Sequence, residues 1–432
     1  NKLALDEQAF VSLLSRLIGE VRSLQNNPPA LIPQEDLAAN HVLATLEPHK
    51  VENGGPLKIR RESFTPGRSN LIIEYPCANP TAKYVSFVGS HMDVVPANPD
   101  DWDFDPFKLT VDGDVLRGRG VTDCLGHVAL LTELFRQIAI NKPVLKVHVA
   151  CVMIANEENS SIEGIGVDEL VNRGMIAHLK NGPVFWVDSA DKHPCVGTAG
   201  MCAWQLKATG KLFHSGLPQQ AINPMELLME AIKYIQDRFY QDFPAHPLEK
   251  EYGFVTCSSL KPTQWSFPGG GVNQIPAEAT ICGDIRVTPF YPVKSAAAAL
   301  QKYVDELNRD ITVLPTRGPA SKYVLPEGLK GTLELSFLGA SYQGIACSME
   351  SQGFKALCKA TEAVLGSCKP YSLTGSLPLV KELQDEGYDL QIMGYGLMKT
   401  YHARNEFGLL SDFKQGLDVM KGVVDEISSQ SP

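Results

Sequence analysis

The feature that most restricts the fold is a set of acidic residues, with one histidine, that follow apolar runs or turns in the first half of the chain. These residues are His91 and Asp93, Asp123, the adjacent pair Glu157 and Glu158, and Asp188. Alone, an acidic pair is usually a solvated surface and an aspartate before a helix is usually its cap. Ligand groups gather at the carboxyl ends of strands in α/β sheets. We therefore expect these side chains to share one site.

The spacing of apolar residues predicts an α/β fold with an insertion. Strand-like runs and helices alternate up to about residue 200, which is typical of a mostly parallel sheet sandwiched by helices. Beyond that point the strands alternate apolar and polar residues, as in a half-exposed antiparallel sheet. We expect a catalytic domain of residues 1–199 and 348–432, with an α+β two-layer domain, residues 200–347, inserted into it.

Within the predicted insertion, individual elements can be placed. Asn223 with Pro224 predicts the start of a helix, since these residues favour the cap and the first turn. A second helix is expected at 295–307, and strands are expected at 203–208, 280–287, 311–314 and 333–338.

Composition excludes several kinds of partner and location. The 39 basic and 49 acidic residues leave a net charge of −10, so neither nucleic acid nor a membrane is an expected partner. No run reaches the roughly 18 apolar residues that cross a bilayer. None of the ten cysteines forms a C-x-x-C pair, which favours free thiols in a reducing compartment. We expect an intracellular, cytoplasmic protein, or an organellar one if a targeting segment was removed.

The residue types at the predicted site favour a metal. Carboxylate and imidazole groups are suitable ligands for Zn²⁺ and related divalent ions. Converging carboxylates repel one another, and a bound cation supplies the missing positive charge. Other chemistries lack their motifs, because the sequence contains neither GxxxxGK[ST] nor G-x-S-x-G.

Eight motifs then identify a family by resemblance. They are SHMDVVP, GRGVTDCLG, ANEE, the strand end at Asp188, ATGKLFHSG, NQIP, GDIRVTP and YHARNE, in this order from residue 90 to 406. The chain resembles the dinuclear zinc hydrolases that include acetylornithine deacetylases, succinyl-diaminopimelate desuccinylases, aminoacylases and carboxypeptidases. The resemblance implies two divalent metal ions per subunit, zinc or alternatively cobalt, and hydrolysis of an N-acyl amino acid. The deacetylase branch further implies N2-acetylornithine as substrate, giving ornithine and acetate in arginine biosynthesis.

The same resemblance assigns roles to matching positions. His91, Asp123 and Asp188 would hold one metal, and Asp123, Glu158 and His402 the other. Asp93 would orient His91, and Glu157 would act as the general base. In the insertion, His214 would stabilise the oxyanion in the partner subunit's site, so a homodimer through this lid domain is implied. The expected substrate contacts are Asn273, Arg286, Gly375 and Ser376, the last two at the start of a helix.

Some positions depart from the family pattern and leave alternatives open. Cys124-Leu125 replaces the usual Met-Lys, and His127 stands where a small residue is common. For His127 we favour packing over a role as metal ligand. A metallo-carboxypeptidase or dipeptidase on the same fold remains an alternative, since it also hydrolyses an amide beside a carboxylate. An alternative of another class is a catalytically silent homologue that binds an amino acid or peptide.

Overall fold

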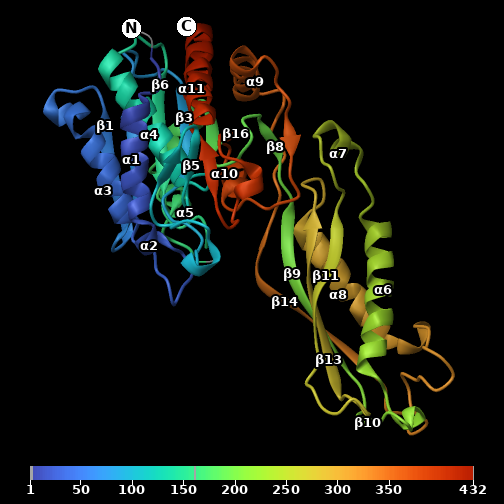
Figure 1. Ribbon diagram of the computed structural model, residues 1–432. Helices are drawn as coiled ribbons and strands as arrows, with labels where there is room; N and C mark the ends of the chain where they lie inside the picture. Colours follow the sequence, from blue (N-terminus) through green and yellow to red (C-terminus); the bar gives the residue numbers. More distant parts are fainter. Residues whose placement is uncertain (1–2, 160–161, 432) are drawn as a thin grey trace. The chain divides into compact units, whose positions relative to one another are not determined.

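The chain divides into two compact units in the computed structural model, which describes residues 3–159 and 162–431. The first unit comprises Asn1–Val196, Cys347–Tyr371 and Pro378–Pro432, and the second comprises Gly197–Ala346 and Ser372–Leu377. The second unit is thus inserted into the first, and a short later segment joins it. Figure 1 shows the chain coloured along its length.

A mixed sheet forms the middle of the first unit. Within the described residues its eight strands run in the order β1 (Lys58–Thr65), β2 (Arg68–Tyr75), β6 (His148–Ile154), β3 (Tyr84–His91), β7 (Pro183–Val187), β16 (Asp389–Met393), β8 (Cys195–Gly197) and β15 (Tyr371–Ser372). The neighbours β6, β3, β7 and β16 are parallel, whereas β1, β2 and β8 pair antiparallel. This arrangement confirms the prediction of a largely parallel central sheet.

Helices pack on this sheet and on one another. They are α1 (Glu7–Gly19), α2 (Val21–Leu24), α3 (Glu35–Leu46), α4 (Leu125–Asn141), α5 (Val167–Asn172), α9 (Gln352–Leu365), α10 (Val380–Asp385) and α11 (Leu410–Gln430). Helix α4 contacts β2 and β3, α9 contacts β7 and β16, and α11 packs on both α4 and α9. A small sheet of β17 (Phe407–Leu409), β5 (Val115–Arg117) and β4 (Thr110–Asp112) completes the unit.

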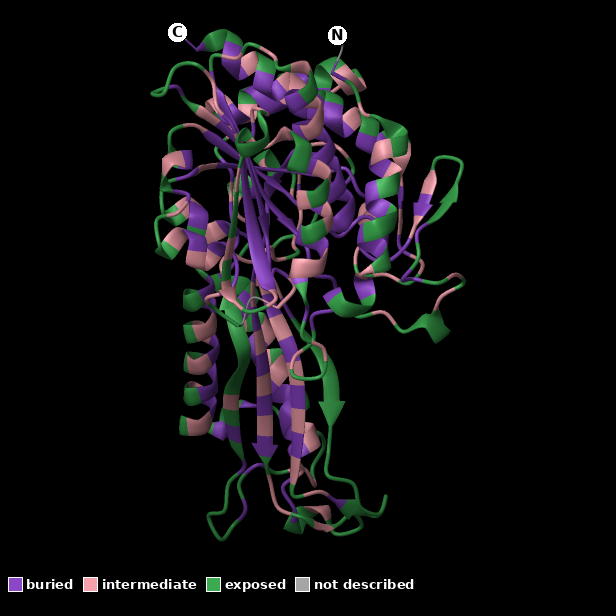
Figure 2. Ribbon diagram, turned by 90° about the vertical axis from the view of Figure 1, so that its left-hand side faces the viewer, coloured by how far each residue is buried: buried purple, intermediate pink, exposed green. Residues whose placement is uncertain are grey.

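Burial explains why the parallel strands carry no polar alternation. Every residue of β6 and β7 is buried, as expected for strands with both faces covered. Figure 2 shows these strands as a continuous buried layer within the unit. The polar residues that matter for chemistry are therefore confined to the strand ends and the turns beyond them.

The second unit is an antiparallel sheet with two long helices. The strands run in the order β11 (Ser259–Ser266), β13 (Glu278–Val287), β9 (Gly200–Thr209) and β14 (Thr332–Tyr342). Strands β9 and β13 alternate buried and half-buried residues, as their sequences predict. Helices α6 (Pro224–Asp242) and α8 (Val293–Arg309) pack on the sheet and on each other. The smaller elements are α7 (Pro247–Glu251), β10 (Phe213–His214) and β12 (Gln274–Ile275).

Three local predictions were wrong in detail. The segment expected as a strand at 311–314 contains a 3-10 turn, Ile311–Val313, because the Asp310 side chain caps the backbone N–H of Thr312. The helical spacing of Phe10, Leu13, Leu14, Leu17, Val21 and Leu24 predicts one opening helix, but this segment is divided between α1 and α2, with Glu20 between them. Gly375 and Ser376 do not start a helix, because α10 begins only at Val380.

None of the helices in the described ranges combines the length and the apolar character that a membrane crossing requires.

Candidate metal centre

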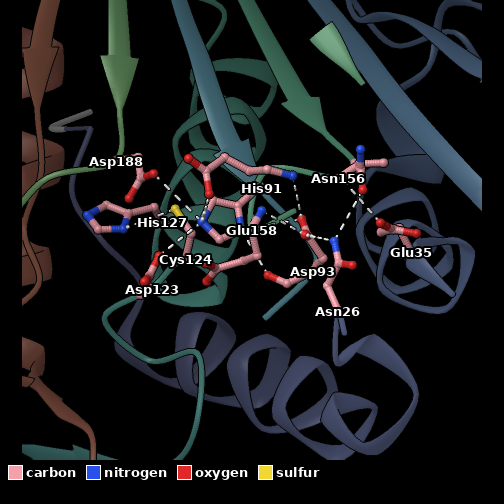
Figure 3. Close-up of polar contacts among 12 residues, drawn as sticks. Asn26, Glu35, His91, Asp93, Asp123, Cys124, His127, Asn156, Glu158 and Asp188 are labelled. Carbon is pink, nitrogen blue, oxygen red and sulfur yellow. Dashed lines mark hydrogen bonds and ion pairs between the residues drawn. The ribbon is translucent and has the colours of Figure 1, made fainter. Parts of the chain in front are cut away.

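Three adjacent parallel strands bring the predicted side chains together. His91 is the last residue of β3, Asp188 follows β7 directly, and Glu157 and Glu158 lie just beyond β6. Because these strands are neighbours and parallel, their carboxyl ends meet at one edge of the sheet. Asp123 joins them from the turn before α4. Figure 3 shows Asp123, Glu158 and Asp188 around His91.

Asp123 stands between two histidines. Its Oδ1 lies 2.9 Å from Nε2 of His91, and its Oδ2 lies 3.0 Å from Nε2 of His402. Asp188 lies on the His91 side, with 3.7 Å between its Oδ2 and Nε2, whereas Oε2 of Glu158 lies 3.1 Å from Nε2 of His402. One carboxylate therefore faces two groups, each made of a histidine and a further acid.

The contacts of His91 define which ring nitrogen faces the acids. Its Nδ1 lies 2.8 Å from the backbone carbonyl oxygen of Asp93, which can only accept a hydrogen bond. Nδ1 therefore carries a proton, and Nε2 is the ring nitrogen that faces the acids, at 2.9 Å from Oδ1 of Asp123. The carboxylate of Asp93 is farther from Nδ1, at 3.5 Å, so the backbone of Asp93 contributes the shorter contact.

The carboxylate of Asp93 instead holds the turn that carries the two glutamates. It accepts hydrogen bonds from the backbone N–H groups of Glu157, at 3.1 Å, and Glu158, at 3.0 Å. Glu157 is buried, and its Oε2 lies 3.8 Å from Nε2 of His91. Asp93 thus connects the position of His91 to the positions of both glutamates.

Burial makes three acids of this cluster, Glu157, Glu158 and Asp188, resist ionisation. Burial and the charge of Asp123 raise the pKa of Glu158 to about 8 and that of Asp188 to about 7. Burial also raises the pKa of Glu157 well above its usual range. Hydrogen bonds to Asp123 and Glu158 raise the pKa of His402 to about 11. A bound cation would supply the positive charge that these carboxylates need in order to ionise together.

The donor atoms fit a divalent metal. Among the described residues, two overlapping groups present ligand atoms within 4.8 Å of one another: His91 with Asp123 and Glu158, and His91 with Cys124 and Asp188. Oε1 of Glu158 is buried and has no hydrogen-bond partner within the described chain, as expected for an oxygen reserved for a metal. Imidazole and carboxylate donors suit Zn²⁺ and its relatives.

His127 is occupied by other partners. Its Nε2 accepts a hydrogen bond from the backbone N–H of Tyr395 at 2.8 Å, and its Nδ1 lies 3.5 Å from Sγ of Cys124. Burial lowers its pKa to about 4, so the ring is neutral. Both nitrogens serve contacts inside the protein, which agrees with a packing role.

Comparison with known proteins places the chain in a family. Residues 87–426 match the family described as "Peptidase family M20/M25/M40". The chain belongs to this family. It is 60% identical over 98% of its length to an acetylornithine deacetylase of Arabidopsis thaliana and covers 96% of that protein. It is 50% identical to the acetylornithine deacetylase of Dictyostelium discoideum, with 98% and 97% of the two chains covered.

The family membership extends to the fold. A dipeptidase from Saccharomyces cerevisiae superposes with a TM-score of 0.69 at 20% identity, over 98% of this chain and 96% of that chain. These findings confirm the resemblance drawn from the motifs. The protein is a metal-dependent hydrolase of the M20/M25/M40 family.

Two residues of the family motif YHARNE hold the centre in ways that the sequence did not reveal. The hydroxyl of Tyr401 donates to Oδ1 of Asp188 at 3.1 Å. Glu406 is buried and accepts from the backbone N–H groups of Gly120, Thr122 and Asp123, each at 2.9 Å. The motif could have drawn attention to Tyr401 and Glu406, since both flank His402. Their partners could not be predicted, because these lie far away in the sequence. Cys124 was noticed only as a departure from the family pattern, although its sulfur lies among the ligand atoms.

The remaining predicted residues belong to the second unit. His214 ends β10 and pairs with Gln274, and Asn273 accepts a backbone hydrogen bond from Ser215 at 2.9 Å, so His214 and Asn273 are close together. Arg286 is the last residue but one of β13 and donates to Oδ2 of Asp284 at 2.8 Å. Gly375 lies in a bend, where its carbonyl accepts from the N–H of Ala199. The expected roles of Gly375, Ser376 and the other three residues remain predictions.

Proposed function

We propose that this hydrolase removes the acetyl group of N2-acetylornithine, yielding ornithine and acetate. The observation that carries the proposal is the position of Asp123 between two histidine–carboxylate groups, with Glu157 beside them. Such a constellation suits the hydrolysis of an amide. The choice of substrate is supported by the acetylornithine deacetylases that match nearly the whole chain.

The proposed site holds two divalent metal ions, with zinc as the first choice and cobalt as the alternative. His91, Asp123 and Asp188 would hold one ion, and Asp123, Glu158 and His402 the other. When bound, such ions act as Lewis acids that polarise the amide carbonyl and lower the pKa of water. Because Nδ1 of His91 carries a proton, Nε2 is the ring nitrogen that would bind the metal ion.

Glu157 is the proposed general base. Its carboxylate is buried beside His91, where an attacking water would lose its proton to Oε2. The same oxygen would then deliver the proton to the leaving amine nitrogen. Glu158 is turned toward His402 instead, so the adjacent glutamates divide into base and ligand.

The inserted unit is proposed to act as lid and dimerisation domain. His214 would stabilise the oxyanion in the partner's site, and Asn273, Arg286, Gly375 and Ser376 would contact the substrate. The largely exposed strand β14 and the exposed His214 are consistent with a surface that meets another subunit.

A substrate panel tests the proposal. Protein loaded with zinc or with cobalt is incubated with N2-acetylornithine, with other N-acetyl amino acids, and with dipeptides, and free amine is measured. We expect the highest kcat/KM on N2-acetylornithine. Preference for a dipeptide would favour the peptidase alternative, and binding without turnover would favour a silent homologue.

A further inference from the structure

The turn that carries Glu157 and Glu158 depends on a residue in an unusual backbone conformation. Asn156 has a φ of 61°, in the left-handed region that residues with a side chain rarely adopt. The side chain is buried and donates from Nδ2 to the carbonyl of Ile162 at 2.6 Å. Asparagine adopts this conformation more readily than most residues with a side chain, and the hydrogen bond to Ile162 helps to hold it. The neighbours of Asn156 therefore bear on both glutamates.

A buried ion pair supplies two of the anchors for Asn156. Arg68 donates to Glu35 through Nε, at 2.9 Å, and through Nη2, at 2.6 Å. The Nη2 atom also donates to Oδ1 of Asn156 at 3.1 Å, while Oε1 of Glu35 accepts from the backbone N–H of Asn156 at 3.2 Å. The ion pair thus contacts Asn156 from both of its members.

Asn26 connects this arrangement to Asp93. Its Nδ2 lies 2.8 Å from Oδ2 of Asp93 and 3.2 Å from Oδ1 of Asn156. Figure 3 shows Asn26 between Asp93 and Asn156, with Glu35 beyond. A continuous series of hydrogen bonds therefore runs from the ion pair to the carboxylate that holds the Glu157–Glu158 turn.

The anchors come from a part of the chain that precedes the family match. Asn26, Glu35 and Arg68 lie in the loop after α2, in α3 and in β2, whereas the match begins at residue 87. Both members of the ion pair are almost fully buried. A buried pair is weak evidence for stability, because removal of two charges from water costs about as much as their attraction returns. That the ion pair holds the turn of Glu157 and Glu158 in position is the more specific explanation.

We propose that Glu35 and Arg68 are positioning residues which, through Asn156, set the orientation of the general base Glu157 and of the metal ligand Glu158. The inference rests on the roles proposed above for these two glutamates. Residues behind the direct ligands of a metal commonly change activity or metal affinity by about 10- to 100-fold when replaced. The same range is expected here, without a change of substrate contact.

The test compares removal of the buried ion pair with removal of the arginine of a more exposed ion pair elsewhere. The variants are Arg68→Met, Glu35→Leu and the double variant Glu35→Leu/Arg68→Met, which restores a neutral interior. Asn156→Gly keeps the ion pair and tolerates the left-handed backbone, but lacks the anchored side chain. The control is Arg136→Met, since Arg136 binds Glu133 through the same two nitrogens, at 2.7 and 3.0 Å, within α4.

Two readouts are measured on each holoenzyme: kcat and KM for N2-acetylornithine, and the affinity for cobalt from its visible absorption in competition with a chelator. We expect kcat to fall about 10- to 100-fold in the double variant and in Asn156→Gly, with a smaller change in KM, and one cobalt ion to bind about tenfold more weakly. Arg136→Met should retain both values.

A double variant that recovers the melting temperature together with wild-type kcat and cobalt affinity would show that the pair serves stability alone. If that variant does not fold, a wild-type kcat together with wild-type cobalt affinity in Asn156→Gly would overturn the proposal. Failure of the wild-type protein to hydrolyse N2-acetylornithine would refute the proposed function instead, and the cobalt measurement would still test the positioning.

Discussion

Glu406 accepts a hydrogen bond from the backbone N–H of Asp123, with 2.9 Å between Oε1 and N, across 283 residues of sequence. The same carboxylate binds Arg119, with 2.7 Å between Oε2 and Nη1. Asp123, the residue at the middle of the candidate metal centre, is thus held by the C-terminal part of the chain. Because Glu406 is buried, its loss would leave several donors without an acceptor.

Replacement of Glu406 should therefore affect stability and the centre together. We expect Glu406→Gln to lower the free energy of unfolding by about 3–5 kcal/mol, as for a broken buried ion pair. Urea denaturation of the two proteins measures the change. The control is Glu306→Gln, which breaks the half-exposed pair with Arg238 and should cost about 0–1 kcal/mol. Equal losses in the two variants would contradict this account.

Replacement of Glu157 tests the division of roles between the adjacent glutamates. We expect Glu157→Gln to lower kcat by about 10²- to 10⁴-fold, because the amide cannot accept a proton from water. The variant should still bind both metal ions, which elemental analysis measures. Glu158→Gln is the matched control, and it should lose metal. Full turnover in Glu157→Gln would refute its role as general base.

The metal content of variants should distinguish the two metal positions proposed on either side of Asp123. We expect two ions per subunit in the wild-type protein, one in Asp188→Ala, and weakened binding of both in Asp123→Ala, since Asp123 faces both histidines. Elemental analysis after dialysis gives the stoichiometry. Chelation should lower the melting temperature, because metal at 100 times its Kd stabilises the folded state by about 2.7 kcal/mol. A stoichiometry that is identical in all three proteins would be inconsistent with the proposed ligand set.

His127 should contribute to stability and not to metal binding. His127→Leu removes the acceptor for the N–H of Tyr395, and leaving that buried donor unpaired should cost about 1–3 kcal/mol. His127→Asn retains an acceptor and should cost less. Denaturation and metal analysis of both variants check this expectation, and loss of a metal ion in either would identify His127 as a ligand.

Subunit mixing tests the role predicted for His214. His214→Ala and Glu157→Ala proteins should each be inactive, whereas a heterodimer of the two would hold one site with both residues intact. We expect partial activity in purified heterodimers that carry two different affinity tags. Heterodimers without activity would argue that His214 serves its own subunit or no site at all.

The family, the mainly parallel sheet and the candidate ligands could be predicted from the sequence, because these depend on local patterns. Apolar runs of strand length predicted the buried strands. The acids at the ends of these runs indicated the edge of the sheet where ligand groups gather. The apolar run at 311–314 predicted a strand, but the side chain of Asp310 caps a 3-10 turn there instead. Local patterns also failed at Gly375 and Ser376, which precede the helix expected to start with them.

The way in which the candidate ligands are held could be seen only in the folded chain. Glu406, Tyr401 and Asn26 contact the centre from remote positions, and no periodicity connects such residues to their partners. The ring of His91 is likewise oriented by a backbone carbonyl, which lies 2.8 Å from Nδ1. Buried polar groups must find partners wherever the fold brings them. The residues that orient a metal centre therefore become visible only after the chain has been folded around it.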